Sequence, residues 1–176
     1  LRAARDAGLL VSHKTVQRGL EYLRRSQIQS DDLSDGGFQY MEGHTKHSYA
    51  LTAAAISSFF LFGRYKDDAA RTIERGLRYM WRQLERGAAD EEWYYYGHFY
   101  GAWAFWQKDG GDWSKESWWG RWAARVLPEL IQERQRSDGS WDDAASGRFA
   151  YGSVLATAFA VLTLSVPDEA LPIFQR

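Results

Sequence analysis

The chain has 176 residues, with 22 Lys and Arg against 23 Asp and Glu, 4 His and no Cys. This even charge gives no electrostatic reason to expect a nucleic acid or an anionic membrane surface as a partner. The absence of cysteine excludes disulfides and thiolate metal sites. No apolar run reaches the ~18–20 residues of a membrane span, so none is predicted, and no feature assigns a cellular compartment. The unusual quantity is the aromatic content of nine Trp, ten Tyr and nine Phe.

The first predicted elements are an amphipathic helix over 14–28 and an almost uncharged helix over 46–62. Val16, Leu20 and Leu23 recur at helical spacing among Arg and Glu, which is typical of a half-buried helix. The segment KHSYALTAAAISSFFLF is apolar or small on nearly every side, which predicts burial on every side. The two segments are separated by a Gly-containing break, SDGG.

The same pattern occurs twice more along the chain. The amphipathic helix that begins at Asp67 has RGLRYM at 75–80, which echoes RGLEYL at 18–23, and the uncharged segment 93–107 follows it. A third amphipathic helix from Lys115, which Pro128 should kink, precedes RSDGSWDDAASG and the charge-free segment 150–164. Within that last segment, ATAFAV at 156–161 resembles LTAAAI at 51–56.

The three occurrences of this pattern predict an all-α fold in one domain, residues 1–176, with repeats at about 14–62, 67–107 and 115–165. Alternating half-buried and fully buried helices predict an outer and an inner layer, arranged as about three hairpins of a partial α/α toroid. An open solenoid of the same hairpins is the alternative. Because three hairpins leave end helices uncovered, we expect self-association or contact with further sequence of a longer chain.

The breaks themselves carry a second motif with an expected structural role. Glycine gives the backbone freedom to turn between outer and inner helices, and a large aromatic residue two positions later can fill the junction. A Gln at the end of the outer helix can hydrogen-bond to backbone groups left free there. The residues concerned are Gly36, Gly37, Phe38, Gln135, Asp138, Gly139 and Trp141.

QRSDGSW at 135–141 resembles the QW repeat of squalene-hopene and oxidosqualene cyclases and, more loosely, of their prenyltransferase β-subunit relatives. GGFQY at 36–40 looks like a degenerate copy. SYALTAAAI, YYYGHFYGAWAF and the terminal segment through LPIFQR resemble the carboxyl end of bacterial prenyltransferase and squalene oxidase repeat proteins. The resemblance covers nearly the whole chain and implies a terpenoid cyclase-like α/α toroid with a cavity for an isoprenoid-like ligand.

The enzymatic hallmarks of those relatives are absent from this sequence. Cyclases of the squalene type protonate their substrate with an Asp-X-Asp-Asp motif, and no such tetrapeptide occurs here. Protein prenyltransferases hold zinc with Asp, Cys and His, and this chain has no Cys. Catalysis is therefore an open question, and we expect no metal centre and no cofactor of this kind.

Two weaker candidates for chemistry are an acidic run and a histidine. Asp31, Asp32 and Asp35 in DDLSD match the DDxxD pattern that holds magnesium against a diphosphate, so Mg²⁺ is one possible ligand of this run. The plainer interpretation is a solvated loop that caps helix ends. His98 within the uncharged helix could donate a proton in a cavity, or lie buried with its ring bonded to a Tyr hydroxyl.

The aromatic residues give the main binding hypothesis. Rings on one helix face stabilise a cation or bind an isoprenoid, although such stripes are more often ordinary core. The expected ligand-binding residues are Tyr49, Tyr96, Tyr100, Trp103 and Tyr151. Three functions follow: an isoprenoid cyclase or transferase relative, a non-catalytic scaffold or protein-interaction domain, and a carbohydrate-active toroid enzyme. The last needs two carboxylates facing a cleft, with Asp90, Glu91, Glu92, Asp142 and Asp143 as candidates.

Overall fold

The computed structural model describes residues 1–62, 67–87, 93–144, 150–169 and 171. The described part consists of helices joined by turns and loops, and its β pairing is limited to two isolated bridges, Gln27 with Phe38 and Gln39 with His47. The all-α prediction is confirmed. The helices are α1 (Arg2–Asp6), α2 (His13–Arg25), α3 (Tyr49–Leu61), α4 (Asp67–Glu85), α5 (Tyr94–Asp109), α6 (Trp118–Pro128) with a π-helical extension (Glu129–Glu133), α7 (Ser153–Leu164) and a 3₁₀ turn (Val166–Asp168).

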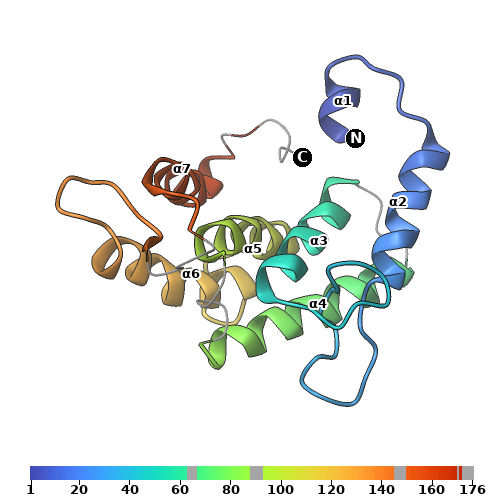
Figure 1. Cartoon of the computed structure of the whole chain (residues 1–176), viewed down its shortest axis with the longest axis horizontal. Coiled ribbons are helices and arrows are strands. Elements are labelled where there is room, and N and C mark those ends of the chain that lie inside the picture. The colour runs from blue at the N-terminus through green and yellow to red at the C-terminus, as the bar shows by residue number, and fades with distance from the viewer. Residues whose placement is uncertain (63–66, 88–92, 145–149, 170, 172–176) are drawn as a thin grey trace.

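The helices form two layers around a shared core. The uncharged helix α5 lies between α3 and α7 and packs against both, while α4 packs against α3 and α6 packs against α5 (Figure 1). Most residues of α3 and α5 are buried, as their uncharged sequences predict. The inner and outer arrangement is therefore present for these helices, and closure into a toroid stays a prediction.

The outer helix that covers each inner helix differs from the predicted unit. The sequence suggests a hairpin of one outer helix followed by its inner helix. In the structure the inner helices α3 and α5 share the most extensive contact, and the outer helices α4 and α6 pack on the inner helices that precede them, α3 and α5. The long break between α2 and α3, residues 26–48, holds those two helices apart. An inner helix is thus covered chiefly by the outer helix that comes after it.

Pro128 changes the end of α6 as expected. Proline cannot donate the backbone hydrogen bond of a regular turn, and its ring crowds the preceding turn. Here α6 ends at Pro128 and continues as the π-helix Glu129–Glu133, in which Leu130 is buried. The wider turn accommodates the proline while keeping the apolar stripe directed toward the core.

The first break is fixed by a small set of hydrogen bonds. The amide of Gln27 donates to the carbonyl of Gly36 (3.1 Å) and to the carbonyl of Thr72 in α4 (2.8 Å). The backbone N–H of Phe38 donates to Oγ1 of Thr52 in α3 (3.0 Å), and the Phe38 ring is 2 % exposed. Gly36 has φ +84°, which a residue with a Cβ adopts only with strain. These bonds join α2, the break, α3 and α4.

The third break, which lies between the π-helix and α7, repeats this arrangement. The amide of Gln135 donates to the carbonyl of Gly139 (3.0 Å), and Gly139 has φ +83°. The N–H of Trp141 donates to Oγ1 of Thr157 in α7 (3.0 Å), and its indole N–H donates to the carbonyl of Leu130 (2.8 Å). The Trp141 side chain is 3 % exposed. Gly36 and Gly139, Phe38 and Trp141, and Thr52 and Thr157 are therefore structurally equivalent.

Helix α7 is less covered than its sequence predicts. Its residues are as apolar as those of α3, yet only Ala156, Ala160 and Thr163 are buried. Val154 is 86 % exposed and Val161 51 %. The uncharged sequence by itself predicts full burial of this helix, and that is wrong for α7. Its exposure agrees with the expectation that three hairpins leave an end helix uncovered, because no outer helix among the described residues covers this side.

Candidate functional site

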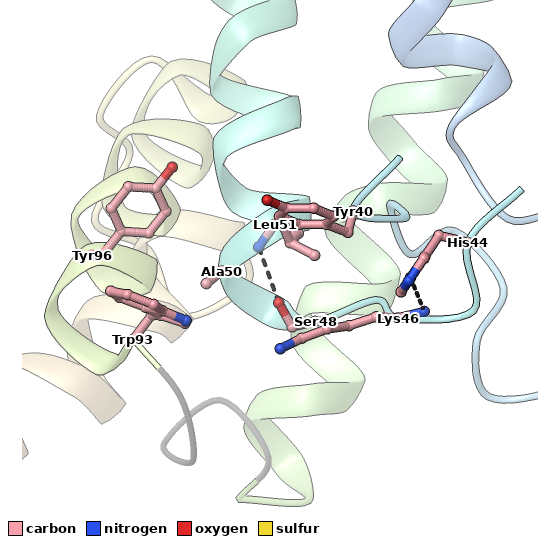
Figure 2. Close-up of a pocket in the computed structure, with 8 residues that line it drawn as sticks. All are labelled: Tyr40, His44, Lys46, Ser48, Ala50, Leu51, Trp93 and Tyr96. Carbon is pink, nitrogen blue, oxygen red and sulfur yellow. Dashed lines mark hydrogen bonds between the residues drawn. The ribbon is translucent and has the colours of Figure 1, made fainter. Parts of the chain in front are cut away.

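A pocket of about 560 Å³ lies where the first break meets the N-terminal ends of α3 and α5. Tyr40 and Lys46 come from the break, Ala50 and Leu51 from α3, and Tyr96 from α5. Among the described residues, the pocket is lined by Tyr40, His44, Lys46, Ser48, Ala50, Leu51, Trp93 and Tyr96 (Figure 2). Its size is within the range of small-molecule sites.

One end of the pocket is polar and basic. Ser48 is the N-cap of α3, and its hydroxyl accepts from the N–H of Leu51 (3.2 Å). The N–H of Lys46 donates to Nδ1 of His44 (3.1 Å). The positive charge of Lys46 and the N-terminal end of α3 favour a negatively charged group at this end of the pocket. Figure 2 shows these groups opposite Trp93 and Tyr96.

The aromatic wall of the pocket continues into a cluster of rings. Trp93 stacks on Tyr151 with centroids 5.7 Å apart and planes 11° apart. The Tyr96 ring lies 4.8 Å from that of Tyr100, and the Tyr96 N–H donates to the Tyr151 hydroxyl oxygen (3.2 Å). Burial raises the pKa values of Tyr96 and Tyr100. Of the predicted ligand-binding residues, the structure thus gathers Tyr96, Tyr100 and Tyr151, and Tyr96 lines the pocket.

Trp93 holds an unusual backbone conformation at the start of α5. Its φ of 59° and ψ of 40° are left-handed, which is uncommon for a bulky residue. Its carbonyl accepts from the N–H of Gly97 (2.7 Å), so α5 begins directly after it. Strained residues of this kind cluster at binding sites, where the surrounding structure holds them in place.

The other two predicted binding residues belong to the core. Tyr49 is 2 % exposed, and its hydroxyl accepts from the indole N–H of Trp122 (3.2 Å). Trp103 is 1 % exposed. Neither lines the pocket. On an uncharged helix, sequence spacing cannot separate rings that face a cavity from rings that fill the core.

His98 is also a core residue, 1 % exposed. Its ring centroid lies 4.3 Å from that of Tyr94, 5.2 Å from Tyr49 and 6.1 Å from Trp122. It does not line the pocket, so the geometry gives it no route to a ligand bound there. Its burial beside Tyr49 and Tyr94 agrees with the interpretation of a core histidine, and the hydrogen bond from its ring to a Tyr hydroxyl stays a prediction.

The acidic run stabilises its own loop. One carboxylate oxygen of Asp32 accepts from the N–H and hydroxyl of Ser34 (2.7 and 2.6 Å) and from the hydroxyl of Ser30 (2.9 Å), and the Ser34 bonds hold the pKa of Asp32 below its usual value. Asp35 forms an ion pair with Arg75 of α4. Burial by itself would raise the pKa of Asp35, but the bonds from Arg75 and from the Ser30 N–H outweigh burial, so its pKa lies below the usual value. Asp31 is exposed.

Across the described ranges, no group of three or more His, Asp or Glu side chains is arranged to hold a metal ion. The carboxylates of the Asp31–Asp35 run therefore do not converge as a magnesium site would require. Asp142 and Asp143 also have structural partners: the Asp142 carbonyl accepts from the Tyr95 hydroxyl (2.9 Å), and the Asp143 carboxylate accepts from the N–H groups of Tyr151 and Gly152. Asp90, Glu91 and Glu92 lie outside the described residues.

Several pocket residues were not among the sequence candidates, notably Tyr40, Lys46, Leu51 and Trp93. Tyr40 and Lys46 lie in a break without helical periodicity, so no pattern places them on a face. Trp93 was within the recognised aromatic run, but its position at the helix start depends on a backbone conformation that sequence does not indicate. The signal that could have indicated Trp93 and Tyr96 was the run of aromatic residues at the start of an uncharged helix.

The buried tyrosines predict a loss of stability at high pH. Burial raises the pKa of Tyr151 to about 12, from about 10 when unfolded. The neutral phenol therefore contributes stability that is complete below about pH 10 and is lost as pH rises toward about 12. Urea unfolding measured across this interval should show a falling free energy of unfolding, with a smaller fall for Tyr151→Phe. Tyr79, whose pKa burial also raises to about 12, should maintain part of the slope in that variant. An identical slope with and without the Tyr151 hydroxyl would contradict the assignment.

Two further findings bear on the chain as a whole. Within the described helices, none is both long enough and apolar enough to cross a membrane. No protein-family model, no curated protein and no solved structure matches this chain.

Proposed function

We propose that this chain binds an apolar ligand of isoprenoid type, with its chain against Trp93 and Tyr96 and a negatively charged head near Lys46. The observation that carries the proposal is the pocket of about 560 Å³, whose aromatic wall faces a basic, polar end. Flat rings bind apolar chains without needing directional hydrogen bonds. The resemblance to terpene cyclases and prenyltransferases names the same class of ligand. Catalysis is not part of the proposal, because the described lining residues include no carboxylate and suggest no reaction.

The test is calorimetric titration of the chain with farnesyl diphosphate and, separately, with farnesol. Tyr96→Ala removes a ring from the wall, and we expect it to raise Kd at least about tenfold for both ligands, the equivalent of about 1.4 kcal/mol of lost apolar contact. Lys46→Ala should weaken the diphosphate more than the alcohol. Trp113→Ala replaces a tryptophan that is 56 % exposed and lies outside this pocket, so it serves as the control.

Trp93→Asn separates ligand binding from folding. Asparagine accepts a left-handed backbone more readily than tryptophan, so helix α5 should still begin at this position. We expect weaker ligand binding with little change in thermal stability. Failure of both ligands to bind the unmodified chain, with or without magnesium, would contradict the proposal.

A non-catalytic scaffold is the second candidate, and the break residues favour it. Gln27, Asp35 and Trp141 all hold helices together through bonds to backbone or to α4, and none of the three lines the pocket. The carbohydrate-active alternative has no such support, because its described carboxylates, Asp142 and Asp143, hold backbone groups of the third repeat.

A further inference from the structure

The first and third breaks are equivalent in their internal bonds and differ in what covers them. A Cβ placed on Gly36 would lie 2.7 Å from the carbonyl carbon of Arg75 and closer still to its oxygen, because α4 crosses directly over this glycine. A Cβ on Gly139, at nearly the same φ, would meet nothing within 4 Å. The third break therefore has the shape that receives an outer helix, without such a helix among the described residues.

Helix α7 also lacks a covering helix along its length, among the described residues. When Thr157 is placed on its equivalent Thr52, Val161 corresponds to Ile56 and Val154 to Tyr49. Ile56 is 0 % exposed and Tyr49 2 %, whereas Val161 is 51 % exposed and Val154 86 %. Positions that are core in α3 are thus open to solvent in α7. Together with Gly139, they form what we call the α7 face.

The chain also carries an outer helix, α2, that is only half-buried: Leu20 and Leu23 pack against the core at its edge. Helix α2 has no fully buried residue, whereas α4 buries seven described ones: Ala69, Ile73, Gly76, Leu77, Tyr79, Met80 and Leu84. The sequences RGLEYL and RGLRYM align Gly19 of α2 with Gly76 of α4. A Cβ on Gly76 would lie 2.8 Å from Cγ1 of Ile56, so this glycine is where α4 meets α3. A Cβ on Gly19 would meet nothing within 4 Å.

We propose that α2 of a second copy of this chain packs on the α7 face, as α4 packs on α3. Gly19 of the second copy then lies over Val161. The same alignment places Arg18 at the position of Arg75, which pairs with Asp35, so Arg18 faces the exposed Asp138. Thr15 takes the position of Thr72, so its carbonyl can accept from the amide of Gln135, as the Thr72 carbonyl accepts from Gln27.

The two surfaces lie at opposite ends of the long axis of the molecule, with α2 at one side of the view and α7 at the other (Figure 1). The contact is therefore head-to-tail, and it forms a closed ring when the rotation between copies returns to the start, or an open chain when it does not. Two copies would place six repeats in one ring. The apolar area now exposed on α7 is buried in either case.

The test is the oligomeric state of the 176-residue chain, measured by light scattering and sedimentation over a wide concentration range. We expect association in the unmodified chain and at least a tenfold weaker association for Val161→Glu. Trp113→Glu, which also replaces an exposed apolar residue with a charge, is the matched control and should associate normally. A chain that stays monomeric at every concentration overturns the proposal.

Gly19→Ala gives a second measurement in which folding and association change in opposite directions. Alanine favours a helix more than glycine does, and the space around Gly19 is open within one copy, so the monomer should unfold at a higher temperature. The same methyl group should weaken association, because the equivalent position in α4 has no room for it. Unchanged association would overturn the assignment of α2 as the docking helix.

Mixing the variants identifies the head-to-tail arrangement. A Val161→Glu copy retains an intact α2, and an Arg18→Glu copy retains an intact α7 face. Each alone should be monomeric, whereas an equal mixture should form a one-to-one complex. Arg18→Glu combined with Asp138→Arg in one chain should restore self-association. No complex in the mixture would show that α7 does not pair with α2, and would overturn the proposal.

Discussion

Replacing Gly36 with alanine should lower the free energy of unfolding by about 2–5 kcal/mol. The new Cβ would be strained at φ +84° and would overlap the backbone carbonyl of Arg75. A left-handed conformation costs a residue with a Cβ roughly 1–2 kcal/mol, and forced packing adds typically 1–3 kcal/mol. The backbone of α4 cannot move aside without disturbing the Arg75–Asp35 ion pair and the bond from Gln27 to Thr72. Urea unfolding followed by circular dichroism measures the effect.

Gly43 supplies the matched control for this substitution. It lies in the same break at φ +80°, and a Cβ there would meet nothing within 4 Å. Gly43→Ala should therefore cost only the conformational part, about 1–2 kcal/mol. The difference between the two variants isolates the close approach of α4 to the break. Equal losses would mean that α4 does not cross over Gly36.

Replacing Trp141 with alanine should destabilise the chain by about 3–5 kcal/mol, the usual cost of removing a large buried aromatic side chain. Trp141 is 3 % exposed and packs in a small core with Tyr94, Tyr95, Leu130 and residues of α7. Thermal and urea unfolding should both show the loss. Trp113→Ala, at a site 56 % exposed, should change stability by less than about 1 kcal/mol.

Trp141→Phe places in the third break the residue that the first break uses. The ring still fills the junction, but the carbonyl of Leu130 loses the donor that the indole supplied at 2.8 Å. A lost hydrogen bond at a buried carbonyl costs about 1–3 kcal/mol, so this variant should fall between the wild-type chain and Trp141→Ala. A larger loss of ligand binding than of stability in either variant would contradict the structural role assigned to this motif.

The sequence by itself determined the helices and the burial of two of them. The charge-free stretches that became α3 and α5 have no polar side to present to water, so burial follows from composition alone. The repeat was likewise readable, and the equivalence of Phe38 and Trp141 is confirmed by their matching bonds to Thr52 and Thr157. The role of Gly36 at the turn followed from the conformations that only glycine adopts easily.

Only the tertiary structure decided which of these residues meet. Tyr49 and Tyr96 look alike in sequence, yet one is enclosed beside Trp122 and the other opens on a pocket, because their orientation depends on how α3 and α5 pack. Tyr40 and Lys46 reach that pocket through a break whose path is set by bonds to distant residues. The exposure of α7 also comes from packing, because an apolar helix is buried only where another element covers it. Helix α4 covers α3, whereas no corresponding outer helix covers α7 among the described residues.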